Sequence, residues 1–136
     1  MITKLSRKVT IALVSLVLYS TTMSVFIYIF NSVKYLDFTT LWLTFFMLST
    51  PMFLIVGVAM AFLFDLFALN SNLKGLAYTI LGGLAILPYS AYIFVLTWSN
   101  TLSYFIFGAI AGLLFFFVQI LFERNIFRKL NNEVYD

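Results

Sequence analysis

Four long apolar runs dominate the sequence and limit what the chain can fold into. A helix that crosses a bilayer needs about 20 mostly apolar residues, and each run is about that long or longer. Only short polar segments separate them, and such short connectors join antiparallel neighbours. The sequence therefore predicts an all-α fold: an integral membrane four-helix up-down bundle that forms one transmembrane domain over residues 1–136. The predicted spans are residues 9–30, 41–69, 76–98 and 104–122.

The composition agrees with a chain that lies in lipid. Hydrophobic residues make up 63% of the sequence and charged residues 10%, whereas soluble domains are about 45–50% apolar and about 25% charged. A single core in a chain of 136 residues cannot hide so much apolar surface from water. In a bilayer the apolar side chains can contact lipid tails and do not have to be buried inside the protein.

The basic residues predict how the chain is oriented. If the N-terminus is cytoplasmic, Lys34 is the one basic residue outside, and the cytoplasmic ones are Lys4, Arg7, Lys8, Lys74, Arg124, Arg128 and Lys129. Cytoplasmic loops of membrane proteins carry this excess of Lys and Arg. We therefore expect both termini in the cytoplasm and a multi-pass protein of the cell membrane, of the bacterial plasma-membrane type.

The net charge of +3 lies at the edges of the apolar runs. This position fits anionic lipid head groups and not a groove for nucleic acid. The tail, residues 123–136, mixes basic and apolar residues. It is predicted either to lie on anionic lipid as an interfacial helix or to bind a partner.

Small residues predict where the helices touch, because apolar packing alone gives no net attraction between helices in lipid. Gly57 and Ala61 lie one turn apart in the second run, Gly82 lies in the third, and Gly108 and Gly112 form a G-x-x-x-G pair in the fourth. We expect these five residues to pack helices together. The glycine pair suits an internal contact or a dimer face, and the sequence leaves both open.

Asp65 is the one acid inside an apolar run, in the stretch AMAFLFDLFALN. It lies near the predicted cytoplasmic end of its span, where the cost of a charge is far lower than at the bilayer centre. Gln119 lies at a similar depth, and Lys74 or Arg124 are further possible partners. Asp65 is therefore either a structural anchor at the inner end of the bundle or an ion or proton site. In the second case Gln119, Thr50 and Tyr89 are candidates to line the same path.

The residue types present argue against catalysis. The chain has neither His nor Cys, which removes the usual zinc ligands, and no Ser or Thr has a base within reach except Asp65. No phosphate-binding or dinucleotide-binding motif is present. We expect no enzyme, no catalytic residue, no cofactor and no metal site.

One segment suggests a relationship. The stretch from Thr50 to Asp65, with Pro51 and Gly57, resembles a segment of uncharacterised small four-span membrane proteins of bacilli. The resemblance implies the same kind of membrane protein and brings no activity with it.

Two functions remain for a chain of this kind. The first is a small non-enzymatic membrane protein with an accessory, immunity or regulatory role, which acts through helix contacts in the bilayer. The alternative is an oligomeric channel or transporter with Asp65 and Gln119 at the cytoplasmic end of its path. The expected partners are membrane lipids with anionic head groups near the basic termini, and a second copy or another membrane protein.

Overall fold

A computed structural model describes residues 2–30, 37–67, 70–93 and 98–126, and within them every element of secondary structure is a helix. The all-α prediction is thereby confirmed for this part of the chain. The described residues form four helical rods. The first is α1 (Ile2–Phe30); the second runs from α2 (Phe38–Pro51) through the π-helix η1 (Met52–Gly57) into α3 (Val58–Leu66); the third is α4 (Ser71–Ile93); and the fourth is α5 (Trp98–Leu121) with the π-helix η2 (Phe122–Ile126).

The helix ends differ from the ends of the predicted apolar runs. The third rod already begins at Ser71, and the Lys74 amide donates to the carbonyl of Asn70 at 2.9 Å. Lys74 is thus helical, although the sequence places it in a connector. The second rod ends at Leu66, three residues before the predicted end at 69. Hydropathy marks the apolar part of a span, whereas backbone hydrogen bonds set where a helix starts and stops.

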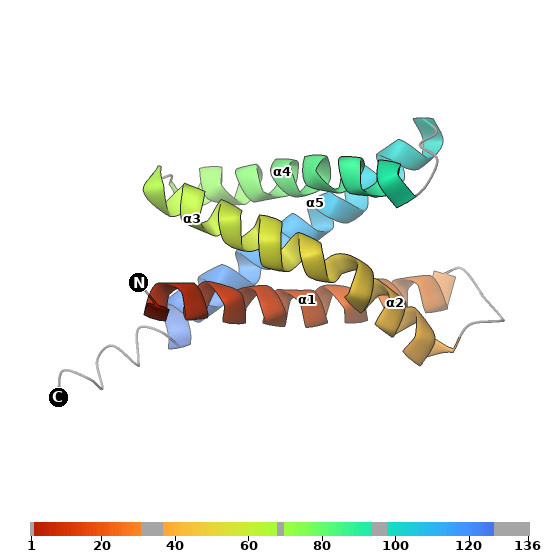
Figure 1. Cartoon of the computed structure of the whole chain (residues 1–136), viewed down its shortest axis with the longest axis horizontal. Coiled ribbons are helices and arrows are strands. Elements are labelled where there is room, and N and C mark those ends of the chain that lie inside the picture. Colours follow the sequence, from red (N-terminus) through yellow and green to blue (C-terminus); the bar gives the residue numbers. More distant parts are fainter. Residues whose placement is uncertain (1, 31–36, 68–69, 94–97, 127–136) are drawn as a thin grey trace.

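Successive rods run in opposite directions (Figure 1). The most extensive contact is between α4 and α5, while α1 contacts α2, η1, α3 and α5. The start of α1, the end of α3, the start of α4 and the end of α5 lie together at one end of the molecule (Figure 1). We call this the Asp65 end, because Asp65 is the next-to-last residue of α3.

The outer surface is apolar. Three rods are long and apolar enough to cross a membrane, namely Lys4–Phe30, Phe38–Leu66 and Thr101–Arg124. Large hydrophobic side chains point outward from every rod, for example Val17, Met47, Leu84 and Phe117. A surface of this kind is stable against lipid tails and is not expected against water. The helices are therefore those of a membrane-compatible protein.

Proline shapes the middle of the second rod. Pro51 has no N–H and its ring crowds the carbonyl one turn earlier, so the regular helical hydrogen bonds cannot continue through it. The rod continues after Pro51 as the π-helix η1, which starts at Met52. The Thr50 hydroxyl donates to the Phe46 carbonyl at 2.6 Å, which satisfies an acceptor beside the interruption. Gly57 then ends η1 where the rod meets Phe115 of α5.

Aromatic rings fill the space between the rods. The Tyr19 ring centroid lies 5.5 Å from that of Phe53, and the Phe115 centroid lies 6.3 Å from Phe53 and 5.4 Å from Tyr78. Beside these rings remains an apolar cavity of about 30 Å³. A cavity of this size has room for about one water-sized group. The rings of α1, η1, α4 and α5 therefore pack closely against one another at this level.

Candidate functional site

Asp65 forms an ion pair with a lysine that lies far away in the sequence. The Lys8 Nζ atom of α1 lies 2.5 Å from Asp65 Oδ2, and it also donates to the Ala61 carbonyl at 3.0 Å. The Phe62 ring covers the same ammonium, with its centroid 5.0 Å from Nζ. Every feature around Nζ is thus an acceptor or a ring face, which suits a buried cation.

The two partners are exposed to very different degrees. The Lys8 side chain is 8% exposed, whereas the Asp65 side chain is 47% exposed. Lysine can bury its long aliphatic stem while the charged tip reaches a polar neighbour. Asp65 therefore lies at the border of the bundle, and Lys8 reaches it from inside.

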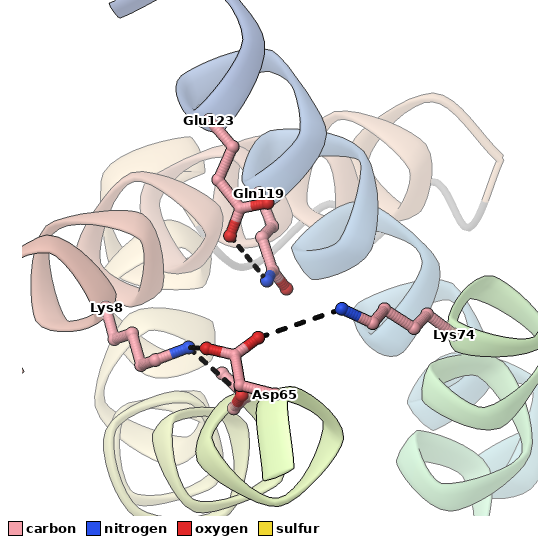
Figure 2. A network of polar contacts seen from close by, with 6 residues as sticks. Lys8, Asp65, Lys74, Gln119 and Glu123 are labelled. Carbon is pink, nitrogen blue, oxygen red and sulfur yellow. Dashed lines mark hydrogen bonds and ion pairs between the residues drawn. The ribbon is translucent and has the colours of Figure 1, made fainter. Parts of the chain in front are cut away.

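A second lysine approaches Asp65 from the other side. The Lys74 Nζ atom lies 3.7 Å from Asp65 Oδ1, and the Lys74 side chain is 23% exposed. Figure 2 shows the carboxylate between the two ammonium groups, which come from α1 and α4. One carboxylate on α3 therefore connects three rods. The two cations also offset the unfavourable position of a carboxylate at a helix C-terminus.

The fourth rod contributes an amide to the same end. Gln119 is 4% exposed, and its Nε2 donates to Glu123 Oε1 at 2.9 Å. In Figure 2 the Gln119 side chain points from α5 toward the space between Asp65 and Lys74. Its Oε1 atom is buried and has no hydrogen-bond partner within the part of the chain that the structure describes. Sequence reasoning places Gln119 beside Asp65 in depth, but the bond it makes is to its own helix.

Tyr78 is a buried polar residue near this end that is not among the candidates predicted from the sequence. It is 1% exposed, and its ring packs edge-on against Phe64 with centroids 4.7 Å apart. Its hydroxyl is also buried, and no described residue forms a hydrogen bond with it. Tyr78 therefore stands between the aromatic core and the charged groups at the Asp65 end.

The predicted packing glycines lie where two rods approach most closely. An ideal Cβ atom on Gly82 would lie 2.5 Å from the Gly108 carbonyl oxygen, and one on Gly112 would overlap the carbonyl of Tyr78. Only glycine fits backbones this close. Gly108 and Gly112 thus lie in a contact between α4 and α5 of one chain. Gly57 likewise faces Phe115, and Ala61 is 1% exposed.

Of the remaining candidates, Thr50 does not join Asp65. Thr50 lies in the middle of the second rod, and its hydroxyl is bound to the carbonyl of its own helix. The side chain of Tyr89 lies outside the described residues, as do Arg128 and Lys129 of the tail. On α1, Ser15 and Tyr19 are buried, whereas Thr22 is exposed.

From the sequence, Lys8 is used only to predict the orientation of the chain in the membrane, and its pairing with Asp65 is not predicted. A signal for its role exists, because Lys8 lies seven residues, or about two helical turns, before the buried Ser15. The face that carries Ser15 and Tyr19 into the interior therefore carries Lys8 as well. A basic residue on the buried face of a span needs an acid in a neighbouring span, and Asp65 is the acid inside the second run.

The site is a set of charged side chains and one amide, at one end of four packed helices. Comparisons with protein-family models, with curated proteins and with solved structures find no match to this chain.

Proposed function

We propose that this chain is a four-span protein of the bacterial plasma membrane, with both termini in the cytoplasm. Its role is non-enzymatic, and it acts on another membrane protein through contacts between helices in the bilayer. Accessory, regulatory and immunity proteins work in this way. The Asp65 end would then face the cytoplasm, with Lys4, Arg7 and Arg124 among anionic head groups.

The observation that carries this proposal is the filled interior of the bundle. Glycine contacts hold α4 against α5, aromatic rings fill the centre, and the Lys8–Asp65 pair lies at one end. What the chain offers to a partner is its outside, which is apolar along every rod. Contacts through such faces depend on the shape of one helix surface against another.

Site-specific photo-crosslinking in native membranes tests this proposal. A photoreactive residue is placed at one exposed apolar position on each rod: Val17, Ile55, Leu84 and Phe117, which are 45–69% exposed. We expect one or two neighbouring faces to yield a discrete product with a second membrane protein, and the other faces to react with lipid. Leu16 is 0% exposed and serves as the matched control beside Val17, since it should react only within the chain.

Products that contain only lipid or a second copy, from all four positions, would contradict this role. A product from every face alike would also count against it, because a specific partner covers one side.

An oligomeric channel or transporter is the second candidate, and one observation favours it. The Asp65 carboxylate is 47% exposed beside two buried polar atoms of Tyr78 and Gln119. A half-exposed acid next to buried polar groups is a common feature of ion and proton paths. Because one chain is filled, the path would run between copies.

Proteoliposomes test the second candidate. The protein is reconstituted into liposomes that contain a pH-sensitive dye. These proteoliposomes are then exposed to gradients of H⁺, Na⁺ or K⁺. A flux that Asp65→Asn abolishes, and that Asp37→Asn at the other end of the second rod retains, supports transport. No flux above protein-free liposomes, or a flux unchanged by Asp65→Asn, removes Asp65 from any transport mechanism.

A further inference from the structure

Two buried polar atoms at the Asp65 end have no hydrogen-bond partner among the described residues. They are the Tyr78 hydroxyl and Gln119 Oε1, on side chains that are 1% and 4% exposed. Buried polar groups in proteins are nearly always hydrogen-bonded, to protein or to ordered water. Two such atoms in one region indicate a shared ligand.

The orientation of the Gln119 amide follows from its neighbour. An ionised Glu123 carboxylate can only accept hydrogen bonds. The Gln119 group that faces it must therefore be the Nε2 donor, which lies 2.9 Å from Glu123 Oε1. Oε1 is therefore the atom that remains for a ligand. It offers lone pairs and requires a donor.

Tyr78 and Gln119 lie on α4 and α5, the two helices that share the most extensive contact. Side chains in a helix lean toward its N-terminus. Tyr78 on α4 therefore leans toward Lys74, one turn earlier, and Figure 2 shows the Gln119 side chain pointing toward the space between Asp65 and Lys74. The Tyr78 ring packs on Phe115, one turn before Gln119, with centroids 5.4 Å apart. The two unpartnered atoms consequently face the same region.

Asp65 borders this region. Phe64, the neighbour of Asp65, packs against the Tyr78 ring with centroids 4.7 Å apart. Among the described residues, the polar contact of Asp65 Oδ1 is the long one of 3.7 Å with Lys74. It therefore keeps lone pairs for another donor.

The charges select the kind of ligand. Lys8 and Lys74 supply two positive charges, and Asp65 and Glu123 supply two negative ones. A further cation would face two ammonium groups, and an anion would face two carboxylates. A neutral molecule that both donates and accepts fits best, and water makes about three hydrogen bonds when buried.

We propose that Tyr78 and Gln119 share one bound water molecule beside Asp65. The water accepts a hydrogen bond from the Tyr78 hydroxyl and donates to Gln119 Oε1 and to Asp65 Oδ1. This site extends the hydration of a half-exposed carboxylate to the edge of the aromatic core. It also gives α3, α4 and α5 a common polar contact that their direct side-chain bonds do not provide.

A double-mutant cycle on the full chain in detergent micelles tests the shared ligand. The variants are Tyr78→Phe, Gln119→Leu and the double variant, followed by thermal unfolding. If both groups hold one water, the first substitution already releases it, and the double variant has a midpoint no lower than that of the less stable single variant. Midpoint shifts that add up in the double variant would overturn the proposal, since independent sites are additive.

A spectroscopic measurement does not depend on how the variants fold. In lipid nanodiscs, magnetisation transfer from water to the Gln119 side-chain amide is measured by NMR on uniformly labelled protein. We expect a long-lived water contact in the native chain and its loss in Tyr78→Phe. Tyr19→Phe removes a hydroxyl from another buried tyrosine, which is 4% exposed and packs on Phe53, and should keep the contact.

No water contact in the native chain, or one that Tyr78→Phe leaves intact, contradicts the shared site. A cation would give a different result: NaCl or KCl would raise the unfolding midpoint of the native chain more than that of Gln119→Leu. That outcome would overturn the assignment of a neutral ligand.

Discussion

The ammonium of Lys8 on α1 lies 2.5 Å from the carboxylate of Asp65 on α3, although 57 residues separate them in the chain. The lysine is the buried partner and the aspartate is the exposed one. This asymmetry decides what each substitution should do.

Asp65→Asn should destabilise the protein more than Lys8→Met. The first leaves a buried ammonium without its carboxylate, which costs about 3 kcal/mol. The second leaves a half-exposed carboxylate that Lys74 and water can still reach, at about 1 kcal/mol. Thermal unfolding in micelles, followed by circular dichroism, measures both. Lys4→Met is the control, since Lys4 is exposed on the same helix, and equal losses for Lys8→Met and Asp65→Asn would refute the asymmetry.

Combining Lys8→Met with Asp65→Asn should restore part of the stability. Replacing a buried ion pair by groups of similar volume is often close to neutral. The double variant is therefore expected to unfold at a higher temperature than Asp65→Asn alone. A double variant that loses the sum of the two single effects would show that the residues do not act as a pair.

Lys74→Met should have a small effect that salt removes. Its Nζ atom lies 3.7 Å from Asp65 Oδ1, and both side chains reach the surface, so the pair contributes about 0.5 kcal/mol. Raising the ionic strength to about 1 M, where the screening length is about 3 Å, should bring native and variant midpoints together. The loss in Lys8→Met should persist under the same conditions, because the Lys8 ammonium is itself buried and buried charges are screened much less. A Lys74→Met effect as large and as salt-resistant as that of Lys8→Met would contradict the geometry.

Gly112→Ala should strongly disrupt the contact between α4 and α5. The new methyl group would overlap the backbone carbonyl of Tyr78, and backbone cannot turn aside. Overpacking of this kind costs about 1–3 kcal/mol, occasionally more. Gly75→Ala is the matched control, because its methyl would meet only the tip of the Phe116 side chain, which can rotate away. The prediction fails if both variants unfold at the temperature of the native chain.

Single cysteines should report the topology. The chain has no Cys, so a membrane-impermeant thiol reagent reacts only at the introduced position. Asp37→Cys should be labelled in intact cells, whereas Lys4→Cys and Asn72→Cys should be labelled only after the membrane is opened. All three positions are exposed. Labelling of Lys4→Cys and Asn72→Cys from opposite sides would rule out two successive spans between them.

The sequence predicts the helices themselves with little ambiguity. Apolar runs of about 20 residues can satisfy their backbone in lipid only as helices, and Gly82, Gly108 and Gly112 mark backbones that approach closely. The ends are less well predicted: Ser71 and Lys74 are helical although they are polar, because helix limits follow hydrogen bonds and not hydropathy. The depth of Asp65 could also be estimated, since it follows from counting residues along one rod.

The partner of Asp65 could not be predicted in the same way. Helical periodicity places Lys8 on the face of Ser15 and Tyr19, and Asp65 on the face of Gly57 and Ala61, but it does not say how far each rod is rotated or shifted against the next. Those two quantities come from packing between residues distant in the chain, such as Tyr19 on Phe53 and Phe64 on Tyr78. The sequence by itself therefore determined a set of membrane-compatible helices with an acid near one end. The tertiary structure alone decided that Lys8 binds that acid from inside while Lys74 approaches it from outside, because only the packed rods bring those charges within a few ångströms.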